Sequence, residues 1–121
     1  MKKKILIIED DNFFRQLLVN KLEEDFDIEV ATDGVEGEKK IYEWQPDLVV
    51  LDMILPEKEG IEILKTLNNN PPEKKPIIVV VSNVMIEEDM DRAKSLGVHH
   101  YFVKAENTPN ELVAKIKMIL S

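Results

Sequence analysis

Short runs of consecutive apolar residues recur along the chain, and each has the pattern of a buried strand. The three strongest runs occupy residues 5–8, 48–51 and 77–81, are mostly rich in β-branched residues, and do not alternate with polar positions. Strands of this kind are covered on both faces, as in the middle of a parallel sheet. Residues 28–31 and 101–103 are two weaker candidates. The pattern therefore predicts five strands.

The segments between these strands have the three-and-four spacing of amphipathic helices. The last helix has the best-marked start, because Thr108 and Glu111 form a capping box with Pro109 at the first helical position. Gly97 is placed to end the fourth helix in a left-handed conformation. The first expected helix carries an apolar stripe at positions 14, 17, 18 and 22, and the last carries one at 112, 113, 116, 119 and 120. The three helices between them are expected at residues 35–43, 60–67 and 87–96.

Strands that alternate with helices five times predict an α/β fold with a doubly wound, five-stranded parallel sheet. Five strands suit the flavodoxin-like order 2-1-3-4-5, in which ligands bind beyond the carboxyl ends of strands 1 and 3. No repeat, linker or shift in composition divides the 121 residues. We therefore expect a single domain over residues 1–121, built around one core.

Composition and charge narrow the classes of partner. A hydrophobic fraction of 44% and a charged fraction of 33% are typical of a globular protein. The net charge of -8 opposes binding to nucleic-acid phosphates and to anionic lipid surfaces, so we expect neither as a direct partner. Cysteine is absent, and the lysines at 2–4 precede an apolar run too short for an export signal. These features predict a cytoplasmic protein.

Residues whose side chains can bind a metal ion or take part in a reaction follow the core strands. Glu9 and Asp10 follow the first strand, Asp52 the third, Ser82 the fourth and Lys104 the fifth. Because the carboxyl ends of parallel strands meet at one edge of a sheet, these side chains are expected to converge. Two carboxylates about 4 Å apart repel by roughly 4 kcal/mol at an effective dielectric of 20, which a divalent cation would balance. Oxygen ligands of this kind favour Mg²⁺.

With these residues in this order, the chain resembles the receiver domain of two-component response regulators. The similarity extends over essentially the whole chain, and its motifs occur in the order and at the spacing of that family. No single motif is specific, but an accidental match of all five in register is improbable. The matching segments are residues 5–11, residues 46–56 followed by Gly60, Ser82 after an apolar strand, and residues 101–104.

The resemblance implies a phosphoacceptor role for Asp52. This carboxylate would take a phosphoryl group from a phosphohistidine of a sensor histidine kinase or a histidine phosphotransfer protein. Asp10 and Asp52 would hold Mg²⁺ directly, together with the backbone carbonyl of Ile54, whereas Glu9 would act mainly through a water molecule on the metal. Lys104 would place its ammonium group on a phosphoryl oxygen.

The resemblance also implies how the signal leaves the domain. Ser82 would move its hydroxyl toward the new phosphoryl group, and Tyr101 would turn inward into the space that opens. The surface of the fourth helix, fifth strand and fifth helix would change and would signal to a separate effector protein. On this interpretation the protein is a signalling switch, not an enzyme, although it assists its own phosphotransfer and dephosphorylation.

Several positions depart from the usual pattern of the family. Ala105 replaces a common proline, so the loop after the fifth strand is expected to have a different shape. Asn83 replaces a smaller residue and is expected to narrow access to the phosphoryl group. Ile54 and Val84 are apolar where the family controls the access of water, which predicts a long-lived phosphorylated state. Asp11 lies beside the acidic pair and is interpreted as the cap of the first helix.

Three other functions fit parts of the pattern. A flavin-binding protein shares the topology, but it needs a phosphate-binding loop rich in Ser, Thr or Gly after the first strand, where this chain is acidic. A Mg²⁺-dependent aspartyl-phosphate hydrolase shares the nucleophile, but Met53 and Ile54 supply no second carboxylate as general acid. A receiver-like docking module that is never phosphorylated would not need the full set of site residues.

Overall fold

The computed structural model describes all 121 residues and contains one parallel sheet surrounded by helices. Strands and helices alternate throughout, as the apolar pattern predicts, and a short 3-10 turn, η1, follows the last strand. The elements are β1 (Lys4–Ile8), α1 (Asn12–Leu22), β2 (Asp27–Ala31), α2 (Gly34–Trp44), β3 (Leu48–Leu51), α3 (Gly60–Asn69), β4 (Ile77–Ser82), α4 (Glu87–Ser95), β5 (His100–Val103), η1 (Lys104–Glu106) and α5 (Pro109–Leu120).

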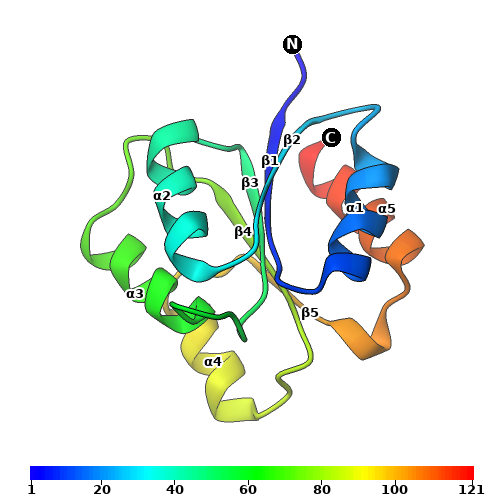
Figure 1. Ribbon diagram of the computed structural model, residues 1–121. Helices are drawn as coiled ribbons and strands as arrows, with labels where there is room; N and C mark the ends of the chain where they lie inside the picture. The colour runs from blue at the N-terminus through cyan, green and yellow to red at the C-terminus, as the bar shows by residue number, and fades with distance from the viewer.

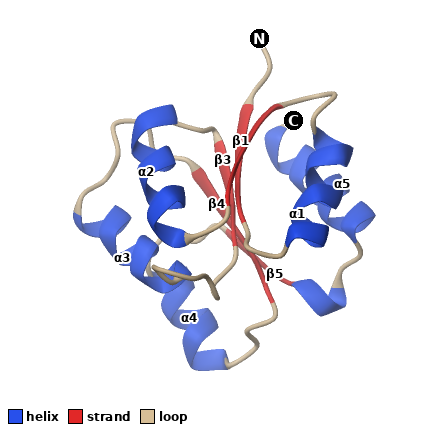
Figure 2. Ribbon diagram, viewed as in Figure 1, coloured by secondary structure: helices blue, strands red, loops and turns tan.

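The sheet has the order β2-β1-β3-β4-β5 with all neighbouring strands parallel, which confirms the predicted topology. Helices α1 and α5 cover one face, and α2, α3 and α4 cover the other (Figures 1 and 2). The strands run downward in Figure 1, away from the end where both chain termini lie. The carboxyl ends of the strands therefore lie together at the lower edge of the sheet.

The core consists of two clusters separated by the sheet. Successive side chains of β1 point to opposite faces, so that Ile5 and Ile7 pack with α1 and α5, whereas Leu6 and Ile8 pack with the three helices on the other side. All four residues of β3 are buried as well. Burial on both faces explains why these strands are continuous apolar runs without polar alternation.

Local side-chain bonds set the helix boundaries. The carboxylate of Asp11 accepts hydrogen bonds from the backbone N–H groups of Phe13 and Phe14, which confirms that Asp11 caps α1. Thr108 and Glu111 form the predicted reciprocal capping box at α5. Gly97, just after α4, has the predicted left-handed backbone, with φ of 101°.

A close backbone approach holds the loop that follows β3 in place. The N–H of Gly34 donates to the carbonyl of Pro56 over 3.1 Å. A Cβ atom at position 34 would lie 1.6 Å from the carbonyl oxygen of Lys58, so that only glycine fits here. The start of α2 thereby supports the loop between β3 and α3, which begins at Asp52.

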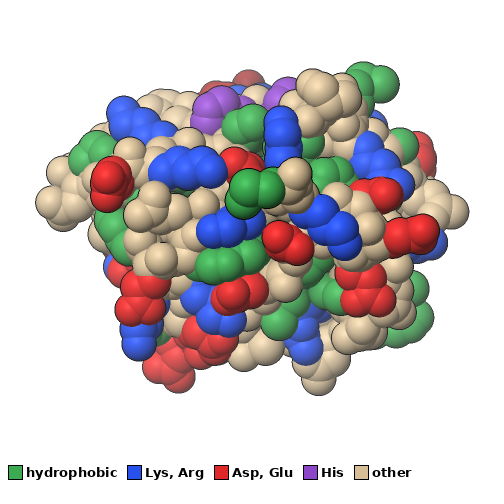
Figure 3. Space-filling view, turned by 90° about the horizontal axis from the view of Figure 1, so that it is seen from above, with side chains coloured by type: hydrophobic (Ala, Val, Ile, Leu, Met, Phe, Trp, Pro, Cys, Tyr) green, Lys and Arg blue, Asp and Glu red, His purple; other side chains and the backbone are tan.

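The end of the molecule that carries the two termini has a mixed charge. Figure 3 shows that basic and acidic side chains are interspersed on this face, without a segregated basic patch. None of the helices has the length and the apolar character needed to cross a membrane.

Candidate functional site

Three carboxylates meet at the carboxyl edge of the sheet, as predicted. Glu9 and Asp10 continue from β1, and Asp52 follows the neighbouring strand β3. The backbone N–H of Asp52 donates to the carbonyl of Ile8 over 3.1 Å, so the ladder of the sheet extends into the site. One carboxylate oxygen from each of the three residues lies within 4.8 Å of the others. Glu9 and Asp52 are buried, whereas Asp10 is exposed.

Lys104 reaches these carboxylates from the end of β5. Its ammonium nitrogen lies 2.6 Å from Oε1 of Glu9 and 3.3 Å from Oδ2 of Asp52. It also lies 4.6 Å from the centre of the Phe14 ring, a cation–π contact from α1. The lysine therefore neutralises part of the negative charge that the strand ends bring together.

The pKa values of Glu9 and Lys104 are both raised in this cluster. Burial raises the pKa of Glu9 to about 7, helped by the charge of Asp52 and opposed by the hydrogen bond from Lys104. Burial lowers the pKa of Lys104, but the bond to Glu9 and the charges of Asp52 and Glu9 outweigh this effect, so the pKa is raised overall. The site therefore favours binding of a further cation or a proton.

The donor set fits a hard divalent metal ion. The candidate ligands are oxygen atoms, without a histidine or cysteine in the cluster. The backbone N–H of Ile54 donates to Oδ1 of Asp52 over 3.2 Å, while the carbonyl of Ile54 accepts no hydrogen bond within the protein. The acidic cluster therefore fits a Mg²⁺ site, and the Ile54 carbonyl has no protein donor that would compete with a metal ion.

Ser82 and Tyr101 lie on the adjacent strands and contact the loop between β4 and α4. The hydroxyl of Ser82 is buried and accepts the N–H of Val84 over 3.3 Å, without a bond to the carboxylates. The hydroxyl of Tyr101 donates to the carbonyl of Val84 over 2.7 Å, and burial raises its pKa. The structure thus brings Glu9, Asp10, Asp52 and Lys104 into one cluster and places the two expected switch residues beside it.

A family model of the response regulator receiver domain matches residues 5–117. The chain belongs to the response regulator receiver family. It is 32% identical to the chemotaxis protein CheY of Halobacterium salinarum, with 94% of each chain covered. It is also 36% identical to the alkaline phosphatase synthesis transcriptional regulatory protein PhoP of Bacillus subtilis, which it matches over 99% of its own length and 49% of that relative.

Solved structures agree with this assignment. A CheY-like response regulator receiver domain protein from Methanospirillum hungatei superposes with a TM-score of 0.88 at 29% identity, and covers 99% of this chain and 94% of that one. The receiver domain described here therefore has the fold, the acidic cluster and the lysine that the sequence resemblance implies.

Two positions that depart from the family pattern contact each other. The backbone N–H of Ala105, within the turn η1, donates to the side-chain oxygen of Asn83 over 2.8 Å. The prediction that Asn83 narrows access to the phosphoryl group did not anticipate this bond.

The contact between Phe14 and Lys104 was also missed, because the sequence pattern assigned Phe14 to the core stripe alone. Neither residue type nor spacing distinguishes a packing phenylalanine from one that also contacts a lysine.

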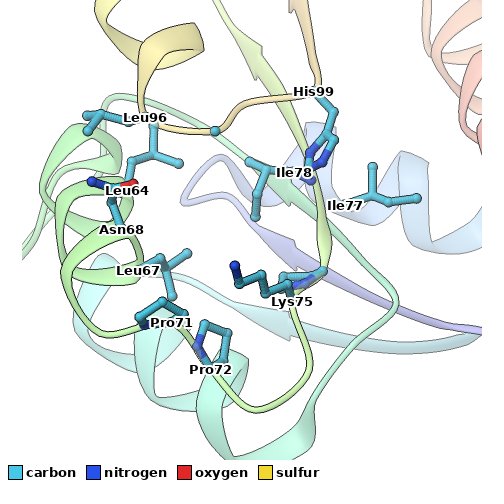
Figure 4. Close-up of a pocket in the computed structure, with 12 residues that line it drawn as sticks. Leu64, Leu67, Asn68, Pro71, Pro72, Lys75, Ile77, Ile78, Leu96 and His99 are labelled. Atoms are coloured by element: carbon cyan, nitrogen blue, oxygen red, sulfur yellow. Dashed lines mark hydrogen bonds between the residues drawn. The ribbon is translucent and has the colours of Figure 1, made fainter.

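Two hollows of the surface lie at opposite ends of the sheet, one of them beside the acidic cluster. A pocket of about 300 Å³ lies between α3 and α4 and includes Ile54 and Val84 in its lining. Another pocket, of about 320 Å³, is lined by the end of α3, the loop before β4 and the turn before β5 (Figure 4). Lys75 and His99 line this second pocket, which lies at the amino-terminal ends of β4 and β5, opposite the edge of the sheet that carries the carboxylates.

Proposed function

We propose that this receiver domain is a phosphorylation switch whose acceptor is Asp52. The observation that carries the proposal is the placement of Asp52, a buried carboxylate held between the Ile54 N–H and the Lys104 ammonium group. In the reaction, a carboxylate oxygen of Asp52 forms a bond to phosphorus as the phosphorus–nitrogen bond of a phosphohistidine breaks. The imidazole leaves with the electron pair, and the product is an acyl phosphate.

The neighbours of Asp52 have separate tasks in this reaction. Lys104 already contacts the carboxylate through its ammonium group, and from the same position it can follow the developing charge onto a phosphoryl oxygen. Asp10, Asp52 and the carbonyl of Ile54 would hold Mg²⁺, with Glu9 in the outer shell. The metal ion supplies electrostatic stabilisation of the transferring phosphoryl group. Ionised Glu9 keeps Lys104 charged and oriented.

The output of the switch passes through the loop between β4 and α4. Ser82 and Tyr101 both bind Val84 in this loop, so a movement of the Ser82 hydroxyl toward a phosphoryl group on Asp52 would alter the support of the Tyr101 ring. The affected surface is formed by α4, β5 and α5, and we propose that a separate effector protein binds there.

The phosphoryl donor proposed for this domain is a sensor histidine kinase or a histidine phosphotransfer protein. The exposed edge of the carboxylate cluster, where Asp10 lies, gives a donor histidine access to the site. Because such kinases draw their phosphoryl groups from cytoplasmic ATP, we propose a cytoplasmic location. The proposed activity is that of a signalling switch, with no substrate other than its own aspartyl phosphate.

Intact-mass analysis after incubation with a small acyl phosphate and Mg²⁺ tests the acceptor. We expect wild-type protein to gain one phosphoryl group and Asp52→Asn to gain none. Asp47→Asn is the matched control, because Asp47 lies at the opposite end of β3 and pairs with Lys74, and it should behave as wild type. If both wild type and Asp52→Asn gained a phosphoryl group, or if neither did, Asp52 would not be the acceptor.

A further inference from the structure

A side-chain hydrogen bond joins the segments that follow β4 and β5, next to Ser82 and Lys104. Strands β4 and β5 pair as far as Ser82 and Val103, and the backbone ladder ends there. Beyond this pair, the side-chain oxygen of Asn83 accepts the N–H of Ala105 over 2.8 Å. The Asn83 side chain therefore extends the connection between the strands by one step, on an exposed part of the surface.

This bond fixes the backbone from which Lys104 reaches into the site. The lysine side chain is long and rotatable, so the position of its backbone decides which carboxylate its ammonium group can reach. In this structure Nζ spans Glu9 and Asp52 and rests against Phe14. A shift of the turn would change the distances from the ammonium nitrogen to the two carboxylates.

The turn is held from a second side by Asn107. The side-chain amide of Asn107 donates to the carbonyl of Val103 over 2.9 Å, and its oxygen accepts Nζ of Lys115 from α5 over 2.5 Å. The three-residue turn η1 is thus fixed between Asn83 on the loop after β4 and Asn107 at the start of the segment leading to α5. Each asparagine acts on the backbone next to Lys104, without a bond to the carboxylates.

We propose that Asn83 is a positioning residue for phosphoryl transfer, which acts by holding the turn that begins at Lys104 against the loop that follows Ser82. The inference rests on the proposed function, since it concerns the rate at which Asp52 accepts a phosphoryl group. A purely steric role for Asn83, as a side chain that narrows access to Asp52, predicts the opposite change in the rate of phosphorylation when the side chain is removed. Removing a steric barrier speeds the reaction, whereas removing a support for Lys104 slows it.

The test compares Asn83→Ala with wild type in rate of phosphorylation by acetyl phosphate and Mg²⁺. We expect the variant to react about fivefold more slowly, equivalent to about 1 kcal/mol, the typical value of one hydrogen bond. Its affinity for Mg²⁺ should be unchanged, because the carboxylates and the Ile54 carbonyl are intact. Asn107→Ala should slow the reaction in the same way. Asn68→Ala is the matched control, because the exposed Asn68 side chain makes no hydrogen bond, and it should react as wild type.

Nuclear magnetic resonance separates positioning from a general loss of stability. In Asn83→Ala the Ala105 amide proton should exchange faster with solvent, and the ammonium signal of Lys104 should move toward that of a free lysine. Asn83→Asp keeps an acceptor at this position and should retain the protection of the Ala105 amide. An Asn83→Ala variant that reacts as fast as wild type, or faster, overturns the proposal. A wild-type protein that is not phosphorylated on Asp52 overturns the proposed function itself.

Discussion

The raised pKa of Glu9 in the acidic cluster predicts how the stability of the metal-free receiver domain depends on pH. Glu9 has an ordinary pKa of 4.5, and burial raises it to about 7 in the folded protein. The folded state therefore binds a proton on Glu9 more tightly than the unfolded state does. The resulting stabilisation is fully present below pH 4.5, decreases as the pH rises, and is lost above about pH 7.

The magnitude follows from the two pKa values. Each pH unit between them corresponds to about 1.36 kcal/mol, so the rise of the Glu9 pKa from 4.5 to about 7 is equivalent to a change of about 3 kcal/mol in the free energy of unfolding. The residue is only 2% exposed, so solvent screening does little to reduce the effect. Binding of Mg²⁺ favours the ionised carboxylates and should largely remove the pH dependence due to Glu9.

Urea unfolding in the presence of a chelator, at intervals from pH 4.5 to pH 8, measures this effect. The quantity of interest is the difference between wild type and Glu9→Gln, because carboxylates outside the acidic cluster contribute equally to both. We expect Glu9→Gln to become more stable relative to wild type by about 3 kcal/mol across this range. Glu62→Gln, at an exposed carboxylate paired with Lys65, is the control and should show no such trend. A constant difference between wild type and Glu9→Gln would refute the reasoning.

Three further predictions concern stability and the lifetime of the switch. Gly34→Ala should lower the free energy of unfolding by about 3 kcal/mol or more, because the new methyl group meets the carbonyl of Lys58; a urea midpoint equal to wild type would contradict the close approach. Thr108→Ala should cost about 1 kcal/mol by thermal or urea unfolding, since it removes a cap of α5, and Thr108→Ser should restore most of it. The phosphorylated form should be long-lived, because Ile54 and Val84 line the hollow beside the site with apolar groups; a half-life of a few seconds for loss of phosphate from the isolated domain would contradict this.

The local pattern of the chain was sufficient to predict the fold and most of the site. Continuous apolar runs require burial on both faces, and strands that alternate with helices leave few topologies, so the order 2-1-3-4-5 followed. Parallel strands then bring Glu9, Asp10, Asp52 and Lys104 to one edge whatever the details of packing. The capping box at Thr108 is equally local and was predicted at its true position.

Tertiary structure alone decided how these groups contact one another. The closer approach of Lys104 to Glu9 than to Asp52 depends on where the turn after β5 lies, and that turn is held by Asn83 through its bond to Ala105. The Phe14 contact depends on the angle at which α1 packs on the sheet. Such contacts join residues far apart in the chain, and their distances follow from packing and side-chain rotamers, which residue type and spacing do not specify. Residue types and their spacing therefore specified which chemical groups share the site, whereas the packing of the helices and loops set the distances from the Lys104 ammonium group to each carboxylate.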